Sequence, residues 1–332
     1  MKTRYLLARS IAALFAGFLP LALHSAEPSG ALSKLQNVHR IVFLGDSITY
    51  AGQYVEDIEA YYVTRFPDRQ IEFINVGLSS ETVSGLSEAG HAGGKYARPD
   101  LHERLGRILT KTKPDLVFAC YGMNDGIYQP FEEERFKKFQ DGMKWLHEQV
   151  LASGAKLIHV TPPVFDPAPI RARTSGDGAE GFSHPFTGYN GVLDRYSKWL
   201  LAQRAAGWDV ADLHAGMNRW LAEQRKQNPD FNFTKDGVHP DNAGHWIMAK
   251  QILLHLGAKD VENADSPAAM LSANPHGGEL LKLIRQKQEL LRDAWLTDTG
   301  YKLPGVKQGL PLPEAEARVA DLNKQIYSTA KP

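Results

Sequence analysis

Short apolar runs alternate with longer stretches of helical periodicity between residues 38 and 258. The runs are expected to form strands, because they are short, rich in branched and aromatic residues, and bounded by turn formers. The predicted strands are 40–44, 71–76, 115–119, 156–160 and 208–211. Helical spacing and helix start and stop signals predict helices over 54–66, 101–110, 132–152, 189–205 and 241–256.

This alternation predicts βαβ units and a parallel sheet. The strand runs are almost continuously apolar, as expected when helices cover both faces of the sheet. Residues 38–258 are therefore predicted to form one three-layer α/β/α domain around a central parallel sheet. In such sheets the ligand crevice lies beyond the carboxyl ends of the strands, so the loops after Leu44, Val76, Cys120 and Val160 should surround one site.

Two segments lie outside this pattern. Residues 164–187 form a long loop rich in Pro, Gly and Ser, and a loop of that length is a candidate for the border of the pocket. Residues 262–332 carry apolar residues at helical spacing from Leu280 to Trp295 and again from Leu312 to Ile326. We expect a helical C-terminal extension whose amphipathic helices pack on the main domain or on a partner.

The N-terminus is typical of an export signal. Basic residues precede an apolar run over 11–23, and the small residues Ser25 and Ala26 follow it. This predicts a signal peptide over 1–26 and a secreted or periplasmic protein. The alternative is an uncleaved anchor, but Pro20 interrupts the run, which is shorter than the roughly 20 residues that span a bilayer. No later segment is apolar enough to span one, so no stable membrane insertion is expected after cleavage.

The composition of the chain limits the classes of partner that are expected. Lys plus Arg number 38 and Asp plus Glu number 38, so the formal net charge is zero. The chain as a whole thus lacks the basic footprint of a nucleic-acid-binding protein, and no nucleic-acid partner is expected. The single cysteine, Cys120, excludes an intrachain disulfide and is interpreted as a small buried hydrophobe in a strand.

Four polar blocks follow this framework. Gly45-Asp46-Ser47 comes directly after the first predicted strand, Gly77 after the second, and Gly122-Met123-Asn124-Asp125 after the third. The fourth block, Asp236 to His239, lies just before the last helix of the domain. Each block alone is an ordinary turn or helix cap. Together they place complementary chemical groups at one edge of the predicted sheet.

The groups form a complete set for acyl transfer. A serine between a strand and a helix presents its hydroxyl near backbone N–H groups, which suits a nucleophile. Three-residue spacing lets the Asp236 carboxylate reach the imidazole of His239 and orient it. The amide of Asn124 and the backbone N–H of Gly77 are candidate donors to a developing oxyanion.

These blocks resemble the four conserved blocks of the SGNH/GDSL hydrolase family over about residues 40–245, with Ile48 where leucine is usual. The resemblance implies a flavodoxin-like α/β/α fold and an esterase mechanism without metal or cofactor. It implies Ser47 as nucleophile, His239 as base and Asp236 as the residue that orients the base. It also implies an oxyanion hole made of the N–H groups of Ser47 and Gly77 and the Asn124 side chain. Nothing is implied for residues 262–332.

The polar, Gly-rich character of loops 77–99 and 164–187 favours a polar ester over a long acyl chain. We therefore expect O-deacetylation of a carbohydrate, with a lipase, lysophospholipase or thioesterase using the same triad as alternatives. Acyl transfer to a sugar instead of water stays open. His91, in the first loop, is a candidate substrate contact.

Two hypotheses of other classes remain. One is a catalytically silent carbohydrate-binding module, which the intact set of Ser47, Asp236 and His239 disfavours. The other is a metal-dependent phosphoesterase, which is disfavoured because it needs a cluster of His, Asp and Asn ligands and no Gly-Asn-His-Glu block appears. His91, His184 and His245 also lack metal-ligand spacing with one another.

Overall fold

A computed structural model describes residues 32–331 and contains one five-stranded parallel sheet in the spatial order β2-β1-β3-β4-β5. β1 (Arg40–Gly45) lies between β2 (Glu72–Asn75) and β3 (Leu116–Cys120), and β4 (Lys156–Val160) and β5 (Asp209–Ala211) complete the sheet. Phe43 is in register with Asn75 on one side and with Phe118 on the other. Because all strands are parallel, their carboxyl ends meet at one edge.

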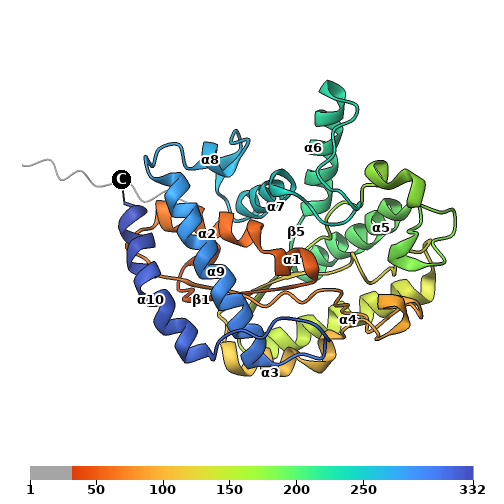
Figure 1. The fold of residues 1–332 in the computed structure, drawn as a ribbon, viewed down its shortest axis with the longest axis horizontal. Coiled ribbons are helices and arrows are strands. Elements are labelled where there is room, and N and C mark those ends of the chain that lie inside the picture. The colour runs from red at the N-terminus through yellow and green to blue at the C-terminus, as the bar shows by residue number, and fades with distance from the viewer. Residues whose placement is uncertain (1–31, 332) are drawn as a thin grey trace, which may run out of the picture.

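The strands form where the apolar runs predict them. Every residue of β3 is buried, and so is every residue of β1 after Arg40. Such burial requires helices on both faces of the sheet. Figure 1 shows α2 (Gln53–Arg65) and α7 (Asn242–His255) on one face and α3 (Leu105–Thr112) and α4 (Glu133–Ala152) on the other. The predicted α/β/α fold class is confirmed.

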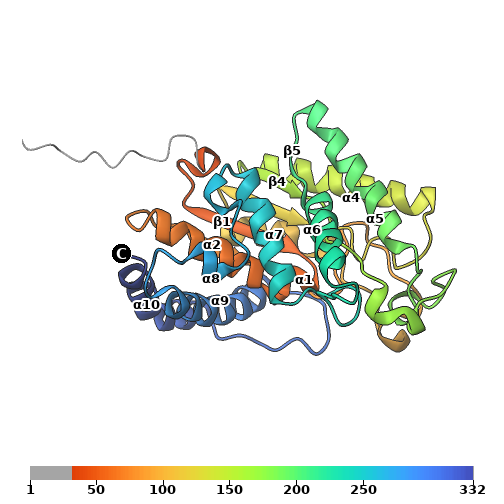
Figure 2. The same cartoon turned by 90° about the horizontal axis from the view of Figure 1, so that it is seen from above.

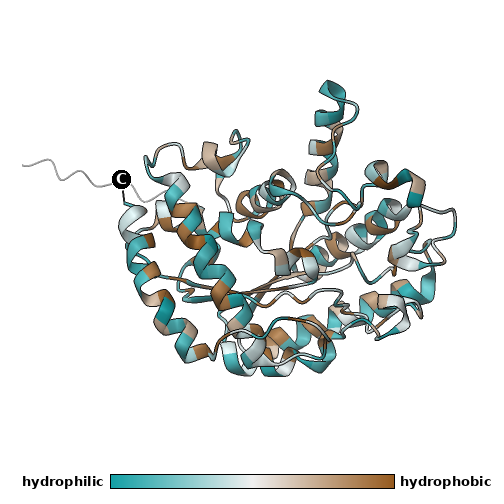
Figure 3. Ribbon diagram, in the orientation of Figure 1, coloured by the Kyte–Doolittle hydropathy of each residue, from teal (hydrophilic) through white to brown (hydrophobic). Residues whose placement is uncertain are grey.

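The other helices of the main domain connect or extend these layers. α5 (Tyr189–Ala202) joins β4 to β5, and α6 (Leu213–Gln227), which the sequence analysis did not predict, follows β5. α1 (Ser47–Ala51) is a single short helix directly after β1. Figure 3 shows apolar residues concentrated in the strands and alternating with hydrophilic residues along the surrounding helices.

The C-terminal extension covers the free edge of the sheet. After the short α8 (Pro267–Met270), α9 (Gly277–Thr299) packs against α2 and the edge strand β2, and α10 (Leu312–Thr329) packs against α9. Figures 1 and 2 both show α9 and α10 side by side. The predicted amphipathic helices thus lie against the main domain, and their buried residues include Leu280, Ile284 and Trp295.

Three features bear on export, membrane insertion and redox chemistry. The predicted signal peptide, 1–26, lies outside the described residues. No helix within residues 32–331 has the length and apolarity that a bilayer crossing requires. Cys120 is a buried free thiol at the end of β3, and burial raises its pKa, so it is an unreactive core residue as expected.

Candidate active site

Ser47 is the first residue of α1, at the carboxyl edge of the sheet. The side chain of Asp46 caps this helix by accepting the Ile48 N–H at 3.0 Å. As the first helical residue, Ser47 has a backbone N–H without a carbonyl partner inside the helix. Gly45 permits the tight entry, because a Cβ there would lie 2.2 Å from Thr49 Oγ1. The local sequence therefore exposes a hydroxyl beside an anion-binding helix start.

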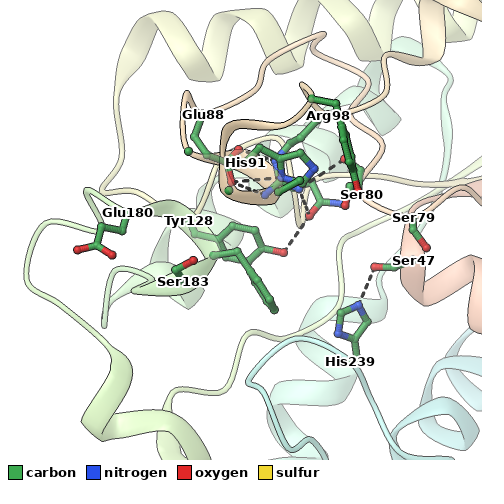
Figure 4. Close-up of a pocket in the computed structure, with 16 residues that line it drawn as sticks. Ser47, Ser79, Ser80, Glu88, His91, Arg98, Tyr128, Glu180, Ser183 and His239 are labelled. Atoms are coloured by element: carbon green, nitrogen blue, oxygen red, sulfur yellow. Dashed lines mark hydrogen bonds and ion pairs between the residues drawn. The ribbon is translucent and has the colours of Figure 1, made fainter. Parts of the chain in front are cut away.

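His239 and Asp236 meet this hydroxyl from the turn before α7. His239 Nε2 lies 2.7 Å from Ser47 Oγ, and His239 Nδ1 lies 2.6 Å from Asp236 Oδ2 (Figure 4 shows the first contact). The other carboxylate oxygen accepts the backbone N–H groups of Val238 and His239 at 3.0 and 2.9 Å. One carboxylate thus shapes the turn and holds the imidazole with Nδ1 as donor, which leaves Nε2 to accept the serine proton.

The charges of this pair reinforce each other. Burial alone would raise the pKa of Asp236, but the hydrogen bonds and charge of His239 hold it well below its usual range. Burial alone would lower the pKa of His239, but the hydrogen bond and charge of Asp236 outweigh it and raise that pKa above its ordinary value. Asp236 therefore remains ionised at neutral pH and stabilises a proton on His239.

The Asn124 amide is held by three hydrogen bonds. Its Oδ1 accepts from Arg98 Nη1 at 3.0 Å and from the Tyr128 hydroxyl at 2.9 Å, and its Nδ2 donates to the Glu81 carbonyl at 3.2 Å. Two donors on Oδ1 fix which end of the amide is oxygen. One N–H of Nδ2 remains available, and Asn124 lines the same cavity as Ser47 and His239.

Gly77 is not presented to this cavity, in contrast to its predicted role. Its N–H donates to Asn75 Oδ1 at 2.9 Å, and a Cβ at this position would lie 2.4 Å from the backbone N of Tyr50. Gly77 is therefore a packing residue beneath α1. Ser79 and Ser80 line the cavity in its place, and Ser80 has a φ of 66°, a conformation that L-residues adopt only rarely.

Asp125 braces the loop after β2. Its Oδ1 accepts the backbone N–H groups of Val83 and Ser84, both at 2.9 Å. The third polar block is thereby tied to the chain that carries Ser79 and Ser80. The carboxyl is buried in this contact, and burial raises its pKa to about 6.

The cavity has a volume of about 410 Å³ and is bordered by both loops that the sequence marked. Residues of the first loop on its wall include Glu88, His91 and Arg98, and residues of the second include Glu180 and Ser183 (Figure 4). Phe182 of the second loop also lines the cavity. Most of these side chains are polar or charged. Arg98, Glu88 and Phe182 were not singled out from the sequence, because no short motif relates them to the four blocks.

The other histidines are dispersed. His91 lines the cavity, His184 pairs with Glu180, and His245 is buried beside Tyr54, where burial lowers its pKa to about 3. Within residues 32–331 no group of three His, Cys, Asp or Glu side chains is placed to hold a metal ion.

An α/β/α fold with a linked serine, histidine and aspartate at the carboxyl edge of its sheet defines the class of acyl hydrolases that the four blocks resemble. Residues 43–247 match the model of the GDSL-like lipase/acylhydrolase family, which is more than half of the chain. The chain belongs to this family and is an ester-hydrolysing enzyme. No curated protein matches it significantly.

Three solved structures are similar to part of the chain. A gut microbial diltiazem-metabolizing enzyme is 24% identical with a TM-score of 0.48, and the match covers 66% of this chain and 47% of that one. An acetylxylan esterase from Geobacillus stearothermophilus is 22% identical with a TM-score of 0.49, and the match covers 66% and 94%. An α/β hydrolase from the metagenome of Lake Arreo, Spain, is 23% identical with a TM-score of 0.49, and the match covers 66% and 95%.

Proposed function

We propose that the protein is a serine esterase that removes small acyl groups, acetyl above all, from a hydroxylated carbohydrate. The observation that carries this proposal is the continuous contact from Asp236 through His239 to Ser47, at 2.6 and 2.7 Å, opening on a small polar cavity. The intact contact argues against a silent binding module.

The proposed reaction has two halves. Ser47 Oγ attacks the ester carbonyl carbon while His239 Nε2 takes the hydroxyl proton, and the alcohol leaves with that proton. Water then attacks the acyl carbon and gives a proton to His239. The carboxylic acid departs as Ser47 regains its proton. Asp236 keeps the imidazole oriented and stabilises its charged form in both halves.

Three N–H groups are assigned to the developing oxyanion. Two are those of the original prediction, the backbone N–H of Ser47 and the free N–H of Asn124 Nδ2. The third is assigned to the backbone of Ser80 instead of Gly77. Ser80 lines the cavity, and its N–H makes no hydrogen bond within residues 32–331, whereas the N–H of Gly77 is already used by Asn75. Such donors act at the point where charge develops.

The wall of the cavity supports the choice of a polar, short-chain ester. A long acyl chain needs a continuous apolar channel, whereas Ser79, Ser80 and Glu180 put polar side chains on the wall of this cavity. Burial lowers the pKa of His91, so a neutral imidazole lines the cavity beside Glu88. A signal peptide over 1–26 would deliver the enzyme to the periplasm or the medium, where acetylated polysaccharides occur.

The test is release of acetate from acetylated xylan, measured beside hydrolysis of 4-nitrophenyl acetate and 4-nitrophenyl palmitate. Wild type, Ser47→Ala and a matched control, Ser272→Ala at an exposed position of the extension, are compared. The proposal predicts acetate release and acetyl-ester hydrolysis by wild type and by the control, and loss of both in Ser47→Ala.

Other outcomes would redirect the assignment. Preference for the palmitate ester would replace the carbohydrate by a lipid substrate. Equal rates in wild type and Ser47→Ala would overturn the serine mechanism.

A further inference from the structure

Arg98 is a buried cation in the wall of the cavity that the proposed mechanism does not use. Its side chain is 2% exposed and forms two hydrogen bonds with Glu88, from Nε to Oε2 and from Nη2 to Oε1, both 2.6 Å long. The guanidinium also lies 5.4 Å from the centre of the Tyr128 ring. A buried charge held on both sides in this way has a fixed position.

The third nitrogen of this guanidinium, Nη1, faces the two residues outside α1 that carry proposed oxyanion donors. Nη1 donates to Asn124 Oδ1 at 3.0 Å and lies 3.5 Å from the Ser80 carbonyl oxygen. Arg98 therefore contacts both Ser80, which follows β2, and Asn124, which follows β3. Both residues carry proposed oxyanion donors. Figure 4 shows Arg98 and Ser80 together on this side of the cavity.

We propose that Arg98 is a positioning residue that fixes the Asn124 amide and the Ser80 backbone in the geometry that receives the oxyanion. The proposal rests on the function proposed above. A donor on Oδ1 prevents the amide from rotating its oxygen toward the substrate. The same hydrogen bond polarises the amide, so that the opposite N–H becomes a stronger donor when negative charge develops.

A direct role in holding an anionic substrate fits the contacts less well. Of the five N–H groups of the guanidinium, two are used by Glu88 and two are directed to Asn124 and Ser80. The Glu88 carboxylate neutralises the charge, and this ion pair lowers the pKa of Glu88 despite its burial. Four of the five N–H groups are thus directed to the protein.

The geometry requires arginine and not merely a positive charge. The planar fork binds Glu88 through two nitrogens while the third nitrogen reaches Asn124. An ammonium group is a single point charge and cannot reproduce both contacts. Arg98→Lys thus keeps a cation for the buried Glu88, which favours folding, and removes the contact to Asn124.

The experiment is a double-mutant cycle on 4-nitrophenyl acetate with Arg98→Lys, Asn124→Ala and the double variant. Melting temperature is recorded to monitor folding, and Arg98→Gln is a second variant at the same position. We expect Arg98→Lys to lower kcat about tenfold with little change in KM, and Asn124→Ala to lower it at least ~100-fold. The double variant should lose clearly less than the product of the two single losses, since Arg98 acts in part through Asn124.

The experiment includes a control variant, and the results that contradict the positioning role differ from those that contradict the proposed function. Arg40→Gln removes an arginine–carboxylate pair, 2.7 Å from Glu72, at the start of β1 on the opposite edge of the sheet, and should leave kcat unchanged. Multiplicative losses in the double variant, or a rise in KM without loss of kcat, would overturn the positioning role. Failure of the proposed function would show already in wild type, as hydrolysis that does not depend on Ser47.

Discussion

At the residue scale, the site depends on groups that each serve two partners. Asp236 holds the turn backbone with one oxygen and the imidazole with the other. Asn124 accepts two hydrogen bonds on its oxygen and keeps one N–H free for a ligand. His239 is the proton acceptor of the proposed mechanism, so its protonation state is a variable that pH can change.

The pH dependence of hydrolysis follows from that variable. His239 accepts the proton of Ser47 only when it is neutral, so kcat/KM should fall as pH drops through the pKa of His239. Because Asp236 raises that pKa above the ordinary value of about 6.5, the midpoint of the acid limb should lie above pH 6.5. Asp236→Asn removes the negative charge and should move the midpoint to lower pH with a lower plateau. Profiles of kcat/KM between pH 5 and 9 check this, and identical midpoints in both proteins would contradict it.

Residue roles could be predicted from the sequence where partners are close along the chain or follow successive strands. Asp236 and His239 lie in one turn. Ser47 and Asn124 follow β1 and β3, which are neighbours in the sheet. The N–H of Gly77 is taken by the side chain of Asn75 only two residues earlier, a local contact that a strand-to-turn pattern does not distinguish from an exposed donor. The role of Arg98 could not be predicted either, because its partners Glu88 and Asn124 come from separate segments of the fold.

At the element scale, the strands were predictable because helices cover both faces and force continuous apolar runs. α6 was missed although Leu213, Met217 and Leu221 recur at helical spacing, since its second half is polar and projects from the molecule (Figure 1). The sequence predicted the helices of the extension but not the elements against which they pack. Only the structure shows that α9 covers the edge of β2 and that Lys287 pairs with Glu59 of α2.

The packing of α9 predicts that the extension stabilises the main domain. Ile284 is fully buried between α9 and its neighbours, whereas Gln286 on the same helix is exposed. Ile284→Ala should lower the free energy of unfolding by about 2–5 kcal/mol, because it removes buried methyl groups and leaves a cavity. Gln286→Ala should change it by less than about 0.5 kcal/mol. Urea unfolding measures both, and equal values would show that α9 is not part of the cooperative unit.

At the scale of the whole molecule, the cavity is assembled by segments that are distant in sequence. The loop after β2 and the long loop after β4 meet where Gly181, at φ 59°, packs against Glu88; a Cβ there would lie 2.8 Å from Glu88 Oε1. Arg173 ties the second loop to the catalytic turn by donating to the Asp236 carbonyl at 3.1 Å. Phe182 of the same loop faces the His239 ring edge-on at 6.4 Å. The shape of the cavity is therefore set by contacts between loops.

Phe182 should limit the length of the acyl group. Phe182→Ala removes an aromatic wall beside His239 and enlarges the cavity, so the ratio of kcat/KM for 4-nitrophenyl butyrate to that for the acetate should rise several-fold. Each additional methylene that finds space contributes about 0.8 kcal/mol of transfer free energy. Phe231→Ala, whose ring packs on Trp220 and does not line the cavity, is the control. An unchanged ratio in Phe182→Ala would exclude Phe182 from the acyl site.

The central claim is that His239 activates Ser47 as the nucleophile, and covalent labelling tests it most directly. The purified protein is incubated with a fluorophosphonate, and its intact mass and peptide map are recorded beside Ser47→Ala and His239→Ala. We predict a single adduct on the peptide that contains Ser47, none at that peptide in Ser47→Ala, and labelling slowed at least ~100-fold in His239→Ala. An unlabelled wild type, or equal labelling of wild type and Ser47→Ala, would contradict the account.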